Sequence, residues 1–193
     1  MNKLICYGDS NSYGWDPTLP LGGRYERSWV EHLQELSGVA CINQGLPGRR
    51  LPTQAAELQA LVALLTSLRG DGLMILLGSN NRFLPPYNSP EETAASMDAL
   101  LLYLRITLPE LSLFLVGLPP MQLPSEDSMI WINTVNRYYA ELAHAHSLPY
   151  FDPLPLGLPL CYDGVHLTAQ GQRILAEGIW KAFFPLQQGA IQP

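Results

Sequence analysis

Short apolar segments alternate with stretches of helical periodicity along the whole chain, and this alternation limits the folds that are open to it. The expected strands are residues 3–7, 39–43, 73–77, 113–116 and 149–152. The expected helices are residues 28–36, 53–67, 89–107, 128–146 and 168–184. Strands that alternate with helices pair in parallel through right-handed crossovers, with helices on both faces. The sequence therefore predicts an α/β fold: a three-layer α/β/α domain around a doubly wound parallel sheet of about five strands.

The length fits one domain, which we expect to span residues 1–193 with a loose tail after about residue 185. Apolar residues make up 47% of the chain and charged residues only 15%, a balance typical of a compact core and not of disorder. The net charge of −6 provides no basic field for phosphate backbones, so we expect no nucleic-acid partner.

The cysteines and the hydropathy pattern predict the cellular setting. Cys6, Cys41 and Cys161 form no paired framework and no metal-binding spacing, so reduced thiols in a reducing compartment are expected. The apolar run near the amino terminus is interrupted at Gly8 too early for a signal peptide, and no run is long enough to span a membrane. We expect a soluble cytoplasmic protein without a membrane span.

A serine follows the first expected strand directly. Residues 4–7 run into Gly8-Asp9-Ser10-Asn11, where glycine and small polar residues end the strand. On its own this segment is better explained as a polar turn. A serine nucleophile would need a histidine base and an orienting carboxylate elsewhere in the chain. Asp163-Gly164-Val165-His166 supplies both residue types, although it too could be an ordinary turn.

Polar or glycine residues follow several expected strands, and topology should bring them together. Ser10, Gly45 and Asn80 each lie just beyond the carboxyl end of a strand, and the turn from Asp163 to His166 follows the last one. The carboxyl ends of parallel strands meet at one edge of the sheet, where ligands usually bind. Taken separately, Gly45 could serve only a positive φ angle and Asn80 only an Asx turn.

These four segments, in this order, resemble the blocks of the SGNH hydrolases, also called GDSL-type esterases and lipases. The matches are Gly8-Asp9-Ser10-Asn11, Asn43-Gln44-Gly45-Leu46-Pro47-Gly48, Gly78-Ser79-Asn80 and Asp163-Gly164-Val165-His166. Asn11 stands where the name-giving motif has leucine, and Asn81 stands where the third block has aspartate. Residues 12–14 and 45–49 also resemble the branch that contains arylesterases and acyltransferases.

The resemblance implies a flavodoxin-like SGNH hydrolase fold and a serine esterase that cleaves small or medium acyl esters, including acetyl and aryl types. It implies a catalytic triad of Ser10, His166 and Asp163, and an oxyanion hole formed by the Ser10 and Gly45 N–H groups and the Asn80 amide. Asp9 is expected to brace the serine turn and not to be the triad acid. No metal and no cofactor are expected, because no cluster has metal-site spacing.

Apolar, proline-rich segments near the expected site have two interpretations. They contain Phe83, Met121 and Trp131, which could line a pocket for an uncharged acyl or aryl group. They could equally bury a contact between subunits of a homo-oligomer. The alternative for the whole chain is a catalytically silent domain, or a flavin- or nucleotide-binding module, on the same scaffold. No glycine-rich phosphate-binding motif follows the first strand to support such a module.

Overall fold

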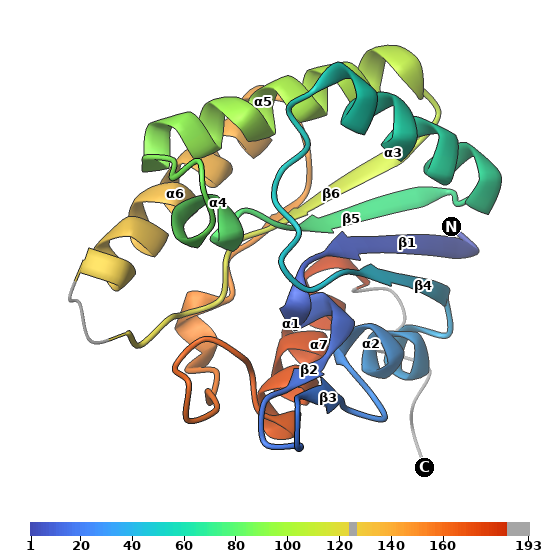
Figure 1. Cartoon of the computed structure of the whole chain (residues 1–193). Helices are drawn as coiled ribbons and strands as arrows, with labels where there is room; N and C mark the ends of the chain where they lie inside the picture. The colour runs from blue at the N-terminus through green and yellow to red at the C-terminus, as the bar shows by residue number, and fades with distance from the viewer. Residues whose placement is uncertain (124–126, 185–193) are drawn as a thin grey trace.

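The strands form a parallel sheet of five, as the sequence predicts (Figure 1). The computed structural model describes residues 1–123 and 127–184. The strands are β1 (Lys3–Gly8), β4 (Ala40–Gly45), β5 (Gly72–Leu76), β6 (Ser112–Val116) and β7 (Tyr150–Phe151). They lie in the order β4-β1-β5-β6-β7, and every neighbouring pair is parallel. The predicted doubly wound α/β fold is confirmed.

Helices cover both faces of the sheet and make the domain three layers thick. The helices α2 (Trp29–Ser37) and α7 (Ala169–Phe183) pack on one face, and α3 (Ala55–Leu68), α5 (Pro90–Thr107) and α6 (Asp127–Ala145) pack on the other (Figure 1). Successive side chains of a strand point to opposite faces. Accordingly Leu4 and Cys6 of β1 join the core under α2 and α7, while Ile5 and Tyr7 join the core under α3, α5 and α6.

Three predicted helix starts have the expected capping chemistry. Ser28 and Ser89 each accept a backbone hydrogen bond from the first turn, and a glutamate three residues later in each case completes a capping box. The Thr168 hydroxyl accepts a hydrogen bond from Gly171 N at 3.0 Å. These side chains satisfy N–H groups that have no partner within the helix, so the residue type marks the start of each helix.

Several short elements escape prediction from the sequence. They are α1 (Ser10–Tyr13), α4 (Ser79–Phe83), the antiparallel pair β2 (Trp15–Asp16) and β3 (Gly23–Arg24), and the 3₁₀ helix Leu154–Leu156. None is long enough to show a hydrophobic period. Both short α-helices nevertheless begin within two or three residues of a strand's end, and both carry a residue of the expected site.

The order of the strands places these two short helices at the point where the sheet changes its winding direction. From β1 the chain moves outward to β4, and it then crosses back to form β5 on the other side of β1. As a result α2 and α5 cover opposite faces, and the loops that leave β1 and β5 diverge. In open α/β sheets this switch point is the usual position of a ligand site.

Other expectations concern the thiols, the membrane and the tail. Cys6 is fully buried in the core, and all three cysteines are free. Within the described ranges no helix is both long and apolar enough to cross a bilayer. The expected loose tail falls on residues 185–193, which lie outside the described part of the chain.

Replacing Gly45 by alanine should destabilise the fold. An added Cβ would lie 2.1 Å from Tyr13 N and 2.5 Å from Ser12 C, which are backbone atoms that cannot move aside locally. We expect the free energy of unfolding to fall by about 3 kcal/mol, at the upper end of overpacking costs. Urea denaturation would measure it.

Gly38→Ala is the matched control for this change. An added Cβ meets no atom within 4 Å there, and only the φ of +67° opposes alanine. The expected cost is about 1 kcal/mol. An equal or larger loss for Gly38→Ala would contradict the close packing of Gly45 against α1.

Candidate active site

Ser10 is the first residue of α1, directly after β1 and the helix N-cap Asp9. The Asp9 carboxylate accepts a hydrogen bond from Asn11 N at 3.0 Å, and Gly14 N donates to Ser10 O at 3.0 Å. These two bonds close the turn from strand to helix at both ends. Ser10 itself is only partly buried, so its hydroxyl is held at the carboxyl edge of the sheet with a side open to a ligand.

The turn that carries His166 is held by the side chain of Asp163. Asp163 Oδ1 accepts hydrogen bonds from the N–H groups of Val165 and His166, both at 3.0 Å. Gly164 has a φ of +67°, and an added Cβ would lie 2.2 Å from Gln122 O, so this position requires glycine. With Oδ1 occupied by the turn, Oδ2 is left to face the imidazole.

Ser10, His166 and Asp163 form a continuous line of hydrogen bonds. His166 Nδ1 donates to Asp163 Oδ2 at 2.6 Å, and His166 Nε2 lies 3.0 Å from Ser10 Oγ. The histidine and aspartate side chains are 19% and 25% exposed. The structure therefore brings together all three residues that the sequence nominated as a triad, although 156 positions separate the serine from the histidine.

The surroundings of Asp163 keep its carboxylate ionised. Burial alone would raise its pKa, but hydrogen bonds from the His166 ring and from the N–H groups of His166 and Val165 outweigh burial. The net effect is a pKa below the ordinary value of 3.8. A negative charge therefore faces His166 Nδ1 at neutral pH.

Asp9 is the second carboxylate near the imidazole, and it has a different environment. Its side chain is only 1% exposed, and burial raises its pKa from 3.8 to about 6 against the opposing effects of the Asn11 N–H, His166 and Arg49. The Arg49 guanidinium donates to Gly8 O at 2.9 Å and to Gln44 O, and its carbon lies 4.0 Å from the centre of the Tyr7 ring. As the sequence suggested, Asp9 belongs to the serine turn.

The three expected oxyanion donors differ in availability. No described residue accepts a hydrogen bond from the Ser10 N–H, which lies at the start of α1. One N–H of the Asn80 amide donates to Arg49 O at 2.9 Å, leaving the second N–H of the amide. The Gly45 N–H was expected to donate to the oxyanion, but it already donates a hydrogen bond to Asn43 Oδ1 at 2.8 Å. Asparagine side chains commonly accept hydrogen bonds from the backbone N–H two residues ahead, and here Asn43 competes with an oxyanion for the Gly45 N–H.

Asn81, which stands where the third block has aspartate, makes hydrogen bonds that hold its loop. Its Oδ1 accepts Leu51 N at 3.0 Å, and its backbone carbonyl accepts Asn88 N at 2.8 Å. The amide is 1% exposed. An uncharged oxygen therefore connects the turn after β5 to the loop after β4, and no buried charge is required for this.

The apolar residues expected to line the site are more deeply buried than that role requires. Met121 and Trp131 are 1% and 5% exposed and belong to the core under α5 and α6, and Phe83 packs against the same core. Trp131 Nε1 also donates to Asn88 O at 3.3 Å. Core packing is thus the observed environment of Met121 and Trp131, since Trp131 lies on the buried side of α6 and Met121 belongs to the same core.

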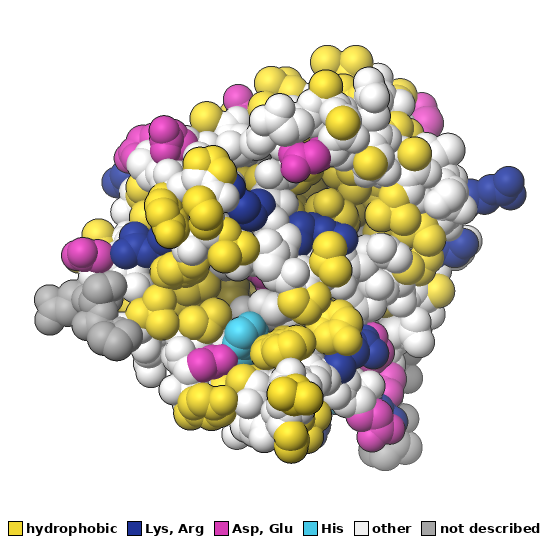
Figure 2. Space-filling model, viewed as in Figure 1, with side chains coloured by type: hydrophobic (Ala, Val, Ile, Leu, Met, Phe, Trp, Pro, Cys, Tyr) yellow, Lys and Arg dark blue, Asp and Glu magenta, His cyan; other side chains and the backbone are white. Residues whose placement is uncertain are grey.

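Trp15 is a residue at the site that sequence reasoning missed. It lies in β2, and its ring centre is 6.3 Å from that of His166. Figure 2 shows hydrophobic side chains gathered around a hollow in this face, with a histidine at its border. The position of Trp15 five residues after Ser10 was the only signal in the sequence, since the short β2 strand gives no pattern.

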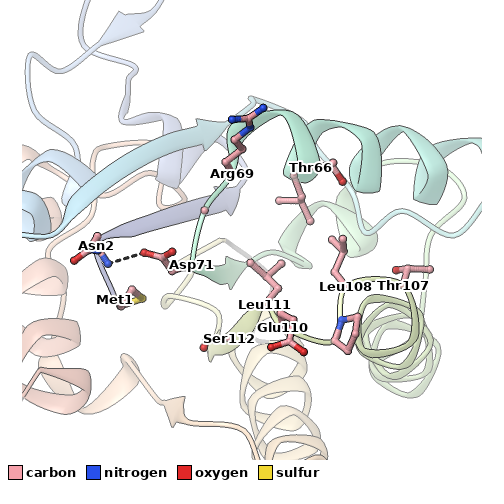
Figure 3. A pocket seen from close by; sticks show the side chains of 13 residues that line it. Met1, Asn2, Thr66, Arg69, Asp71, Thr107, Leu108, Glu110, Leu111 and Ser112 are labelled. Atoms are coloured by element: carbon pink, nitrogen blue, oxygen red, sulfur yellow. Dashed lines mark hydrogen bonds between the residues drawn. The ribbon is translucent and has the colours of Figure 1, made fainter.

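A surface pocket of about 680 Å³ lies elsewhere (Figure 3). Its wall includes Asn2, Asp71 and Ser112, at the amino-terminal ends of β1, β5 and β6. In Figure 3 the Asp71 carboxylate faces Asn2, whose backbone N–H donates to it at 2.6 Å. This pocket lies at the opposite end of the strands from Ser10, so its size does not make it part of the candidate site.

Within the described part of the chain, no three His, Cys, Asp or Glu side chains are placed to hold a metal ion together.

Comparisons with solved structures show where this fold occurs. Est24, a carbohydrate acetylesterase from Sinorhizobium meliloti, is 23% identical with a TM-score of 0.80, covering 96% of this chain and 100% of that one. The inhibitor-bound aryl esterase of M. smegmatis is 21% identical with a TM-score of 0.78, covering 95% and 100%. A catalytic mutant of Axe2, an acetylxylan esterase from Geobacillus stearothermophilus, is 17% identical with a TM-score of 0.69, covering 94% and 93%.

Comparison with curated proteins finds no match. The sequence profile of the GDSL-like Lipase/Acylhydrolase family, in contrast, matches residues 6–174, from the first strand into the last helix. This match spans all four of the segments whose side chains meet at the carboxyl edge of the sheet. The chain therefore belongs to the GDSL-like lipase/acylhydrolase family of hydrolases.

Proposed function

We propose that this protein is a serine esterase that cleaves small or medium acyl esters, of acetyl or aryl type, through an acyl-enzyme. The observation that carries the proposal is the unbroken line from Ser10 Oγ through His166 to Asp163, with distances of 3.0 and 2.6 Å. A serine hydroxyl is a weak nucleophile unless an adjacent base takes its proton. Here the base is within reach of the hydroxyl, and a carboxylate orients the base.

The proton transfers follow from the two ends of the imidazole. Because Nδ1 donates to the ionised Asp163, Nε2 carries the lone pair that faces Ser10. Ser10 Oγ attacks the ester carbonyl while Nε2 takes the hydroxyl proton, and the same proton then passes to the departing alcohol. Asp163 stabilises the imidazolium between these steps. In deacylation, Nε2 activates a water molecule that attacks the acyl-enzyme and releases Ser10.

The oxyanion of the tetrahedral intermediate needs N–H donors near Ser10. The Ser10 N–H and the second N–H of the Asn80 amide are the best supported donors, since neither has another described acceptor. The Gly45 N–H remains the predicted third donor, and it would have to share its hydrogen with Asn43 Oδ1 or leave that oxygen. Donors fixed in place before the reaction stabilise developing charge without reorganisation.

The substrate class is supported by the rim of the site and by the fold relatives. The centre of the Trp15 ring lies 6.3 Å from the centre of the His166 ring. Figure 2 shows hydrophobic side chains around a hollow with a histidine at its border, a surface that suits an uncharged acyl or aryl group. Relatives with the same fold are described as a carbohydrate acetylesterase and an aryl esterase. Because Met121 and Trp131 are packed into the core, their side chains are not exposed to line a deep acyl pocket, in keeping with short acyl chains.

Replacing Ser10 or His166 by alanine should abolish most of the activity. Each change removes one member of a hydrogen-bonded unit, so kcat for p-nitrophenyl acetate should fall by several orders of magnitude. The double variant should be hardly worse than either single one. His32→Ala is the control, because its partly exposed imidazole is only 3.9 Å from Glu35 and takes no part in the site. A fluorophosphonate that fails to label Ser10 in the folded protein would refute the mechanism.

The Asn80 amide should be worth about a hundredfold in rate. Removing one oxyanion donor commonly costs about 3 kcal/mol of transition-state stabilisation. Asn80→Ala should therefore lower kcat about a hundredfold with little change in KM. Asn80→Asp should be worse, because a carboxylate repels the oxyanion. If KM rises while kcat stays unchanged, Asn80 binds the substrate's ground state and is not an oxyanion donor.

Asp9 should make the protein less stable as pH rises from 4 to 6. In that range the unfolded chain ionises Asp9 while the folded chain keeps it protonated, because burial raises its folded pKa from 3.8 to about 6. The stability of the wild type relative to Asp9→Asn should therefore fall by up to about 3 kcal/mol between pH 3.5 and pH 7. Urea denaturation of both proteins across this range measures the difference. A difference that is independent of pH would contradict the raised pKa.

A further inference from the structure

Asn11, the residue after the serine, makes hydrogen bonds to the backbone on both sides of His166. Its Oδ1 accepts the Leu167 N–H at 3.0 Å, and its Nδ2 donates to Val165 O at 3.3 Å. Asn11 is 2% exposed and Leu167 is completely buried. One neutral amide thus satisfies a buried donor, the Leu167 N–H, and a partly buried acceptor, the Val165 carbonyl, on the two sides of the histidine.

A second buried amide holds Asn11 from the other side. Gln172 in α7 is completely buried; its Nε2 donates to Asn11 O at 3.1 Å, and its Oε1 accepts Trp29 N at 2.8 Å. The α1 turn is therefore connected through amides to the histidine turn and to the start of α2. Among the residues that the structure describes, Asn11 is the member of this network whose side chain bonds to the backbone beside His166.

We propose that Asn11 is a positioning residue that sets the distance between His166 Nε2 and Ser10 Oγ. This proposal rests on the proposed function, since it concerns the same serine and histidine. Asn11 is covalently adjacent to the nucleophile and is hydrogen-bonded to both neighbours of the base. The two reacting atoms are thereby tied together by a path much shorter than the 156 positions along the chain. A misplacement of about 1 Å between reacting groups can cost a hundredfold in rate.

Leucine, the name-giving residue at this position, cannot do the same work. It has the same number of side-chain heavy atoms as asparagine but no donor or acceptor among them. In an Asn11→Leu variant the buried Leu167 N–H would lose its acceptor, and the partly buried Val165 carbonyl would lose its donor. An unpaired buried group is costly, so the histidine turn should move to find another partner.

The first experiment compares Asn11→Leu with Gln172→Leu. Both changes remove a buried amide that makes two hydrogen bonds, but only Asn11 contacts the residues beside His166. We expect both variants to lower the Tm, and Asn11→Leu alone to lower kcat for p-nitrophenyl acetate by about tenfold to a hundredfold at nearly constant KM. An equal loss of kcat in Gln172→Leu, or an unchanged kcat in Asn11→Leu, would overturn the proposal.

The second experiment asks whether Asn11 acts through the histidine. In a His166→Ala background, Asn11→Leu should have little further effect on the acylation rate, because the group it positions is gone. A loss as large as in the wild type would show that Asn11 acts otherwise. If Asn11→Leu does not fold, Asn11→Ala and Asn11→Asp are measured in the same two backgrounds. Full activity of His166→Ala would refute the proposed function itself, whereas a damaged His166→Ala with an undamaged Asn11→Leu would refute only the role of Asn11.

Discussion

The parallel register of β1 with both of its neighbours is the constraint on which the site depends. Gly8, the last residue of β1, lies opposite Gly45 of β4 and Leu76 of β5. Three consecutive strands of the sheet therefore end at the same level, and their turns leave from one edge. A slip of one residue would exchange the two faces of β1 and turn Ser10 away from the other turns. The buried side chains on both faces of β1 make such a slip expensive, so core packing also fixes the position of Ser10.

Local patterns and topology are what the sequence predicts well. The long strands and helices follow from apolar periodicity, and Ser28, Ser89 and Thr168 mark helix starts because their hydroxyls satisfy otherwise unpaired N–H groups. The meeting of Ser10 with His166 follows from a general property of parallel sheets, since any such sheet collects the turns after its strands at one edge. The order of the motifs then predicts which of those turns contain the residues of the candidate site.

Features that depend on side-chain conformation or on packing between distant elements are not predictable in this way. Asn43 captures the Gly45 N–H through a particular rotamer, and the burial of Trp131 depends on how α6 lies against the sheet edge. His146 is a further example: it has no partner pattern in the sequence, yet its Nε2 lies 2.6 Å from Asp98 Oδ1, 48 positions away. These outcomes are decided by the tertiary structure, and short windows of sequence contain little of that information.

The two carboxylates near His166 show how the environment assigns different roles to the same chemical group. Asp163 is partly exposed and receives three hydrogen bonds from its own turn and from the imidazole, so the ionised form is favoured. Asp9 is enclosed, and although the Asn11 N–H donates to its carboxylate, desolvation dominates and its pKa rises to about 6. A carboxylate that must stabilise a transient imidazolium has to be charged before the reaction begins. Of these two carboxylates, only Asp163 is ionised over the acidic as well as the neutral pH range. Asp163 is therefore better suited than Asp9 to be the triad acid.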